Sequence, residues 1–139
     1  MTESLDKIER TLLLKQPILK VWQAITEPDQ IRLWFGSDCQ FELEIGALGF
    51  FEWEEECEGK FAMQIVSVRP PEYFAWRWML KENVPFAHNN STLVEWYLKS
   101  TEQGTRLTLT ESGFANAKHV EMNNQGWDQE LDDLQQFLK

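Results

Sequence analysis

The hydrophobic period of this sequence changes twice. Between residues 39 and 111, apolar residues recur at every second position, and glycines, prolines and polar turns interrupt them. This pattern is typical of strands with one buried face. The segments on either side show helical spacing instead. A chain with these two periods predicts an antiparallel sheet that is covered by helices.

The N-terminal part predicts one strand and two short helices. Residues 7–14 (KIERTLLL) form the predicted strand. The next segment places one apolar helical face at positions i, i+3, i+4 and i+7, occupied by Ile18, Val21, Trp22 and Ile25. Pro28 breaks this helix, and residues 29–35 predict a second short helix.

Six further strands are predicted from residue 39 onward. Five of them have a readable inward row: Phe51 and Trp53; Phe61, Met63 and Ile65; Phe74, Trp76 and Trp78; Thr92, Val94, Trp96 and Leu98; and Thr105, Leu107 and Leu109. We expect Gly46 and Gly49 to bracket the turn before the third strand, and residues 81–91 to form a polar loop.

The last segment returns to helical spacing. Residues 119–138 predict one long helix with an apolar stripe made of Val120, Trp127, Leu131, Leu134 and Leu138. A glycine inside a helix costs about 1 kcal/mol relative to alanine. Gly126 therefore predicts a neighbouring element that packs closely against this helix.

Together these elements predict an α+β fold. A curved seven-stranded antiparallel sheet wraps around a long C-terminal helix, and two short helices lie between the first and second strands. An open sheet of this size curls, so its concave face needs the cover that the C-terminal stripe can supply. Because no linker or repeat divides residues 1–139, we expect a single domain.

Charge and composition exclude several partners. The formal net charge is -10, and no cluster of lysine and arginine relieves it. Such a surface repels phosphate backbones and anionic membranes, so we expect neither nucleic acid nor a membrane as a partner. The charged N-terminus does not resemble a signal peptide, and no apolar run of roughly 18 residues could span a bilayer. We therefore expect a cytoplasmic protein.

Four segments carry a family resemblance. They are VWQAITEPDQIRLWF (21–35), RPPEYFAWRW (69–78), GTRLTLTESGF (104–114) and GWDQELDDLQQFL (126–138). With these four segments in this order, the chain resembles the START-like superfamily, which includes polyketide cyclases and lipid-transport proteins. Within that superfamily, it resembles the activator of heat-shock-protein ATPase homologue family. Where such proteins often carry Gly-Gly before the third strand, this chain has GALG at 46–49, which predicts a longer turn.

The resemblance implies a helix-grip fold with a cavity between the sheet and the C-terminal helix. It further implies that a lipid, a polyketide or another apolar molecule binds there. A minority of such proteins catalyse cyclisation or hydrolysis, and the eukaryotic members act on a chaperone in the stress response. These are three different functions, and family membership alone does not choose among them.

The inward-facing apolar residues either fill a core or line a ligand pocket. The candidate ligand-binding residues are Phe51, Trp53, Phe61, Met63, Phe74, Trp76, Trp78, Trp96, Leu109, Glu111, Phe114, Trp127 and Leu131. We expect a small apolar or amphipathic molecule between the sheet and the C-terminal helix. The alternative partner is a chaperone or another protein on the outer surface, and both a monomer and a homodimer stay open.

Glu111 is the most informative charged residue. It continues the inward row of the last strand, so a period of two points its carboxylate toward the cavity. If the strand has already ended, Glu111 is solvated at the rim. An inward carboxylate could hold the polar end of a ligand, or act as an acid with a pocket water in a cyclase-like or hydrolase-like enzyme. Arg10 could also point inward. A non-enzymatic binder is the preferred hypothesis, with no catalytic residue assigned.

No metal or cofactor is predicted. Cys39 and Cys57 match no zinc-binding spacing, and two cysteines in a cytoplasmic protein predict reduced thiols. Residues 52–58 (EWEEECE) are acidic, but a cation needs oxygens folded around one point, and a strand spreads them out. We expect a solvated hairpin end in which the charges discourage edge pairing.

Overall fold

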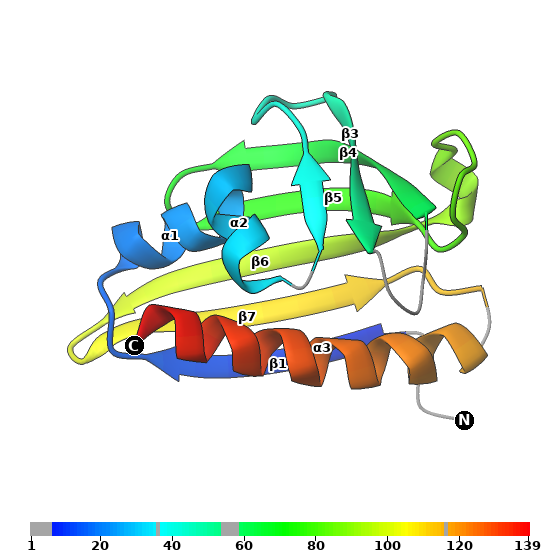
Figure 1. The fold of residues 1–139 in the computed structure, drawn as a ribbon. Helices are drawn as coiled ribbons and strands as arrows, with labels where there is room; N and C mark the ends of the chain where they lie inside the picture. Colours follow the sequence, from blue (N-terminus) through cyan, green and yellow to red (C-terminus); the bar gives the residue numbers. More distant parts are fainter. Residues whose placement is uncertain (1–6, 36, 54–58, 116) are drawn as a thin grey trace.

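The computed structural model describes residues 7–35, 37–53, 59–115 and 117–139. Its seven strands form one antiparallel sheet in the order β1-β7-β6-β5-β4-β3-β2 (Figure 1). The strands are β1 (Lys7–Leu14), β2 (Asp38–Gln40), β3 (Leu48–Trp53), β4 (Gly59–Arg69), β5 (Tyr73–Met79), β6 (Ser91–Thr101) and β7 (Gly104–Ser112). The predicted α+β helix-grip architecture is confirmed.

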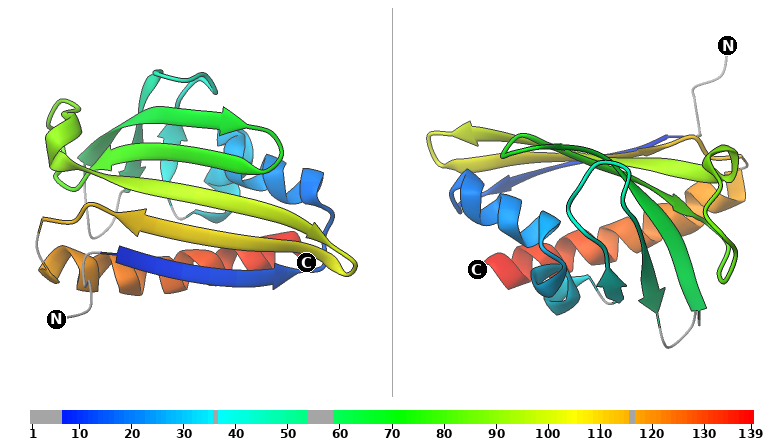
Figure 2. Two further views of the ribbon diagram at one scale, coloured as in Figure 1. Left: turned by 180° about the vertical axis from the view of Figure 1, so that it is seen from behind. Right: turned by 90° about the horizontal axis from the view of Figure 1, so that it is seen from above.

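All three α-helices lie on one face of the sheet (Figure 2, right). They are α1 (Ile18–Thr26) and α2 (Pro28–Trp34), which connect β1 to β2, and α3 (Ala117–Leu138), which follows β7. A short 3-10 turn, η1 (His88–Asn90), lies between β5 and β6. The long helix runs along β1 and β7 (Figure 1) and contacts both α1 and α2. The helices thus cover the concave face, as the apolar stripes predict.

The apolar stripes of the helices are buried as the sequence predicts. Val21 and Ile25 of α1 are fully buried, and so are Leu134 and Leu138 of α3. Pro28 occupies the first turn of α2, where its missing N–H removes no hydrogen bond. Spacing alone therefore identifies the buried face of α1 and of α3.

Strand β4 carries a β-bulge that changes which residues face inward. Met63 pairs with Trp78 and Ile65 pairs with Trp76, but the register shifts between Ile65 and Ser67. Beyond the shift, Val68 packs against the core. The inward row of β4 therefore moves from odd to even positions. A bulge bends its strand and increases the local twist, which curves the sheet around the helices.

Two glycines differ from their predicted roles. Gly49 lies inside β3 and not in the preceding turn. A Cβ at this position would stand 2.2 Å from the carbonyl oxygen of Gln40, so glycine permits two backbone segments to approach closely. The prediction for Gly126 was wrong, because a Cβ there would meet nothing within 4 Å. This position lies on the solvent-facing side of α3.

Cys39 carries a buried free thiol on β2. Burial is the largest effect on it and raises the pKa of this thiol to about 11, although the nearby Arg32 guanidinium acts in the opposite direction. Cys57, and most of the acidic run at 52–58, lie outside the described residues.

We expect Cys39 to resist alkylation in the folded protein. The thiolate is the reactive species, and both burial and the raised pKa keep its population low near pH 8. Iodoacetamide should label Cys39 slowly in the native protein and fully after denaturation, as peptide mass spectrometry of both samples would show. Equal labelling rates in the two samples would contradict the buried position of this side chain.

Candidate functional site

Glu111 lies at the centre of the candidate site, near the end of β7. It pairs with Ile8 on one side and with Val94 on the other. Its side chain is 0% exposed. The strand thus continues past this position, and the structure decides for the inward orientation and against the solvated rim.

Four neutral side chains donate hydrogen bonds to the Glu111 carboxylate. Oε1 accepts from Trp127 Nε1 at 2.7 Å, and Oε2 accepts from Trp78 Nε1 at 2.8 Å. Thr92 Oγ1 donates to Oε2 at 2.5 Å, and Asn123 Nδ2 lies 3.1 Å from both oxygens. The donors come from β5, β6 and α3. The carboxylate therefore joins the centre of the sheet to the long helix.

This arrangement satisfies the hydrogen-bonding capacity of Glu111. An ionised carboxylate offers about four lone-pair sites, and indole N–H groups can only donate. Both oxygens accept from N–H donors, so the donor set is one that suits a carboxylate anion. Among the ion pairs of the described residues, none includes Glu111. A new group could bind its oxygens only by displacing a present donor, which favours a positioning role.

The predicted aromatic residues come together in one packed cluster. The ring of Trp127 lies 5.9 Å from Trp78 and 5.7 Å from Trp96, measured between centroids. Phe51 lies 5.1 Å from Trp76. Several other predicted residues are buried beside this cluster: Met63, Phe74, Leu109, Phe114 and Leu131. Phe61 is half-buried on β4, and the side chain of Trp53 is outside the described part of the chain.

Sequence reasoning assigned neither Phe35 nor Asn123 to the site, and it named Thr92 only as an inward residue of its strand. Phe35, just after α2, lies 5.3 Å from Phe51 and 5.7 Å from Trp127, so it joins the sheet, α2 and α3. Asn123 precedes Trp127 by four residues, and both donate to Glu111. Positions i and i+4 share a helix face, and this spacing was the signal that could have identified Asn123.

Arg10 reaches the long helix from β1. Its Nε donates to Asp128 Oδ1 at 2.9 Å, and its Nη2 donates to Asn124 Oδ1. At the other end of α3, Gln16 Nε2 donates to the carbonyl oxygen of Leu138. From the sequence, Arg10 could point inward. In the structure, its side chain connects β1 to α3 at the edge of the sheet.

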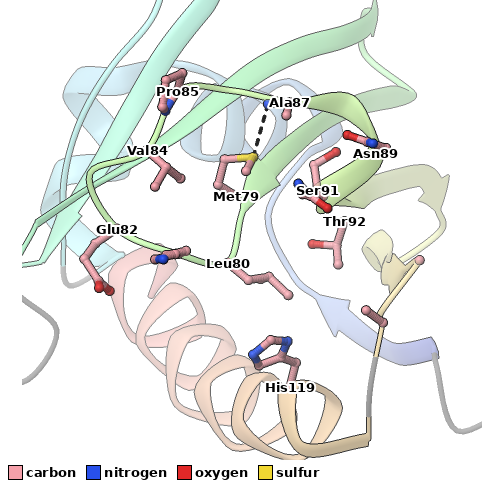
Figure 3. Close-up of a pocket in the computed structure, with 14 residues that line it drawn as sticks. Met79, Leu80, Glu82, Val84, Pro85, Ala87, Asn89, Ser91, Thr92 and His119 are labelled. Atoms are coloured by element: carbon pink, nitrogen blue, oxygen red, sulfur yellow. Dashed lines mark hydrogen bonds between the residues drawn. The ribbon is translucent and has the colours of Figure 1, made fainter.

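A pocket of about 680 Å³ is shown in Figure 3. It lies beside the Glu111 constellation, by which we mean Glu111 and its donors Trp78, Thr92, Asn123 and Trp127. Its walls are formed by the end of β5, the β5–β6 connection, the start of β6, the turn after β7 and the first turn of α3. Its apolar wall includes Met79, Leu80, Val84 and Pro85. Its polar wall includes Asn89, Ser91, Thr92 and His119. Thr92 belongs to both the pocket and the Glu111 constellation.

The predicted ligand-binding residues lie next to this pocket. With Trp53 left aside, none of them lines it directly. Trp78 precedes the lining residue Met79, and Phe114 stands between two lining residues, Gly113 and Ala115. A direct contact between the predicted residues and a ligand stays a prediction. The loop at 81–91 was predicted as polar, but its part in a pocket was not.

Within the described ranges, no three His, Cys, Asp or Glu side chains are grouped so that they could hold a metal ion. No described helix is long and apolar enough to cross a membrane.

The family model for "Activator of Hsp90 ATPase homolog 1-like protein" matches residues 15–139. The chain belongs to this family. Its fold also matches that of several solved structures, and the curated proteins include no match.

Protein MLL2253 from Mesorhizobium loti has a TM-score of 0.81 and 23% identity, with 95% of this chain and 96% of that chain covered. The Aha1 dimer from Colwellia psychrerythraea has a TM-score of 0.78 and 20% identity, with 95% of both chains covered. DynU16, from the dynemicin biosynthetic locus, has a TM-score of 0.80 and 22% identity, and the alignment covers 96% of this chain but 47% of DynU16. At these identities the likeness shows a shared fold.

Proposed function

We propose that this protein binds a small amphipathic molecule in the pocket between the β5–β6 connection and α3. The observation that carries the proposal is the pocket itself, with its volume of about 680 Å³ and with one apolar and one polar wall. Ligand sites in proteins are typically about 300–1,000 Å³ and combine apolar walls with a few placed polar groups. The size and the lining both suit a small molecule.

The floor of the pocket supports binding without catalysis. Thr92 is 1% exposed and is held by Glu111, which is itself buried. Glu111 accepts from donors on both of its oxygens, so it orients its neighbours and has no vacant position for a reacting water. The helix-grip fold and the family membership agree with a binding role, and DynU16 shows that this fold occurs in a biosynthetic locus.

The predicted aromatic residues form the support behind this pocket. Trp78 and Trp127 donate to the same carboxylate as Thr92 and stack on each other at 5.9 Å. A ligand seated against Thr92 would therefore lie close to two indole rings. In this proposal, ligand binding changes the tryptophan fluorescence of the protein.

Filling the pocket is expected to abolish binding of a neutral apolar dye. Ala115 is exposed and lines the pocket, so Ala115→Trp places a large ring there without disturbing the core. We expect Nile red to bind the wild-type protein with a blue-shifted emission, and Ala115→Trp to weaken its affinity at least about tenfold, or about 1.4 kcal/mol. A fluorescence titration measures both affinities.

Ala117→Trp is the matched control. Ala117 is also exposed, begins α3, and does not line the pocket. This variant should bind Nile red like the wild type. Equal affinities of all three proteins would place the dye elsewhere and refute the proposed site, and so would a wild-type protein that binds no dye.

A further inference from the structure

We infer that Thr92 makes the pocket selective for ligands whose polar end donates a hydrogen bond. This inference rests on the proposed function and names the chemical class that the pocket accepts: an apolar body with a hydroxyl or ammonium end. The geometry around two hydroxyl groups and one buried carboxylate carries it.

The hydrogen of the Thr92 hydroxyl is committed to Glu111. Thr92 Oγ1 lies 2.5 Å from Oε2 of the carboxylate. Trp78 and Trp127 can only donate, and each already donates to one carboxylate oxygen, so the carboxylate acts as the acceptor for Thr92 as well. This hydroxyl makes no other hydrogen bond among the described residues. Its remaining lone pairs can only accept, and Thr92 is one of the side chains that line the pocket (Figure 3).

Ser91, the other hydroxyl of the polar wall, is committed in the same way. Its Oγ donates to the carbonyl oxygen of His88 at 2.6 Å and accepts from Arg77 Nη1 at 3.3 Å. Each hydroxyl has one hydrogen to donate. Neither Ser91 nor Thr92 can therefore donate to a ligand without breaking a bond within the protein.

The negative charge of the Glu111 carboxylate also favours a ligand end that donates a hydrogen bond. The Glu111 carboxylate stands one hydroxyl group away from the pocket and is 0% exposed. A buried charge interacts more strongly than one in water, because the effective dielectric constant is lower. The pocket is also lined by Lys81 and Glu82, two exposed residues of opposite charge on the loop. The buried carboxylate thus disfavours an anionic ligand end near Thr92 and favours a hydroxyl or an ammonium group.

The opposite wall fits the apolar body of such a ligand. Met79 is buried, Leu80 and Val84 are half-buried, and Pro85 lies further along the loop. Figure 3 shows these side chains at the end of β5 and on the β5–β6 connection, across from Thr92. A molecule that places its donor group on Thr92 can therefore lay its hydrocarbon part against this wall.

Four probes with similar chains test the inference by displacement of Nile red. Octanol and methyl heptyl ether are isomers, but only octanol donates a hydrogen bond. Octylamine carries an ammonium donor, and octanoate carries an anionic acceptor. We expect octanol to bind about three to ten times more tightly than the ether, which is the range for one net hydrogen bond. Octylamine should also bind more tightly than the ether, and octanoate should bind most weakly.

Variants of Thr92 assign the preference to this hydroxyl. Thr92→Val keeps the shape and removes the acceptor, so octanol and its isomeric ether should bind equally. Thr92→Ser should retain the preference for octanol. Thr108→Val is the matched control, because Thr108 bonds to Thr11 on the outer face of the sheet, and this variant should retain the preference too.

The outcomes separate the inference from the proposed function. If the wild type binds octanol, the ether and octanoate equally, and Ala115→Trp still abolishes binding, the pocket binds ligands but the donor selectivity is refuted. A preference for octanol that survives in Thr92→Val would refute the role of Thr92. If the wild type binds Nile red in this pocket and none of the four probes displaces it, the inference is refuted but the proposed site is not. A wild type that binds no dye refutes both. The wild-type comparison decides the selectivity even if Thr92→Val does not fold.

Discussion

Replacing Glu111 with alanine is expected to remove at least about 4 kcal/mol from the free energy of unfolding. The variant leaves a group of donors without their acceptor, from Trp78, Thr92, Asn123 and Trp127. A buried donor without a partner costs about 1–3 kcal/mol. Because domains are stable by only about 5–15 kcal/mol, this loss is a large part of the total. Urea denaturation followed by circular dichroism measures it.

Two further variants provide a comparison for the stability loss of Glu111→Ala. Glu111→Gln keeps the shape and one oxygen, but its amide hydrogens face an indole donor, so its loss should be smaller than that of Glu111→Ala and still clear. Glu102 is exposed in the β6–β7 turn, so Glu102→Gln should stay within about 0.5 kcal/mol of the wild type. A Glu111→Ala protein as stable as Glu102→Gln would show that the carboxylate does not hold α3 to the sheet.

Replacing Trp127 with alanine is expected to cost about 3–5 kcal/mol of stability, the range for truncating a packed tryptophan. Its side chain is 3% exposed and contacts the rings of Trp78, Trp96 and Phe35. The same change removes the hydrogen bond to Glu111 Oε1. Thermal and urea denaturation should both show the loss.

The Trp127→Phe variant separates packing from hydrogen bonding. Phenylalanine keeps an aromatic ring in the cluster but has no N–H, so its loss should be nearer to about 1–3 kcal/mol. Trp127→Phe combined with Glu111→Gln should show a coupling energy, since residues in one hydrogen-bond network are not additive. Strictly additive losses would mean that the 2.7 Å hydrogen bond between these two side chains does not contribute to stability.

The parts of the fold with a regular period could be predicted from the sequence. Val21 and Ile25 identify the buried face of α1, and Trp76 and Trp78 identify that of β5, because local geometry sets both periods. Glu111 shows where this reasoning ends. Its odd-numbered position in β7 predicts the direction of the side chain. Its burial depends on pairing with Ile8 and Val94, which are distant in the sequence.

The pocket lies where the sequence has no period. Val84 and Asn89 belong to the connection between β5 and β6, and the position of an irregular segment is set by what packs around it. Asn123 lies four residues before Trp127, so the two side chains share a helix face. A polar side chain on that face can be exposed to solvent or can donate to a buried acceptor, and the sequence does not distinguish the two. Gly49 and Gly126 show a similar ambiguity, because a glycine marks either a close approach or an open face.

The β-bulge in β4 shifts the alternation of inward-facing and outward-facing residues by one position. Before it, inward positions are odd (Met63, Ile65); after it, they are even (Val68). Consider an ungapped alignment of this strand with a relative whose strand has no bulge. On one side of Val66, such an alignment would match inward-facing residues with outward-facing ones. A one-residue insertion or deletion here is therefore coupled to the curvature of the sheet. Family members that differ in length at this point should differ in how tightly the sheet closes on its helices.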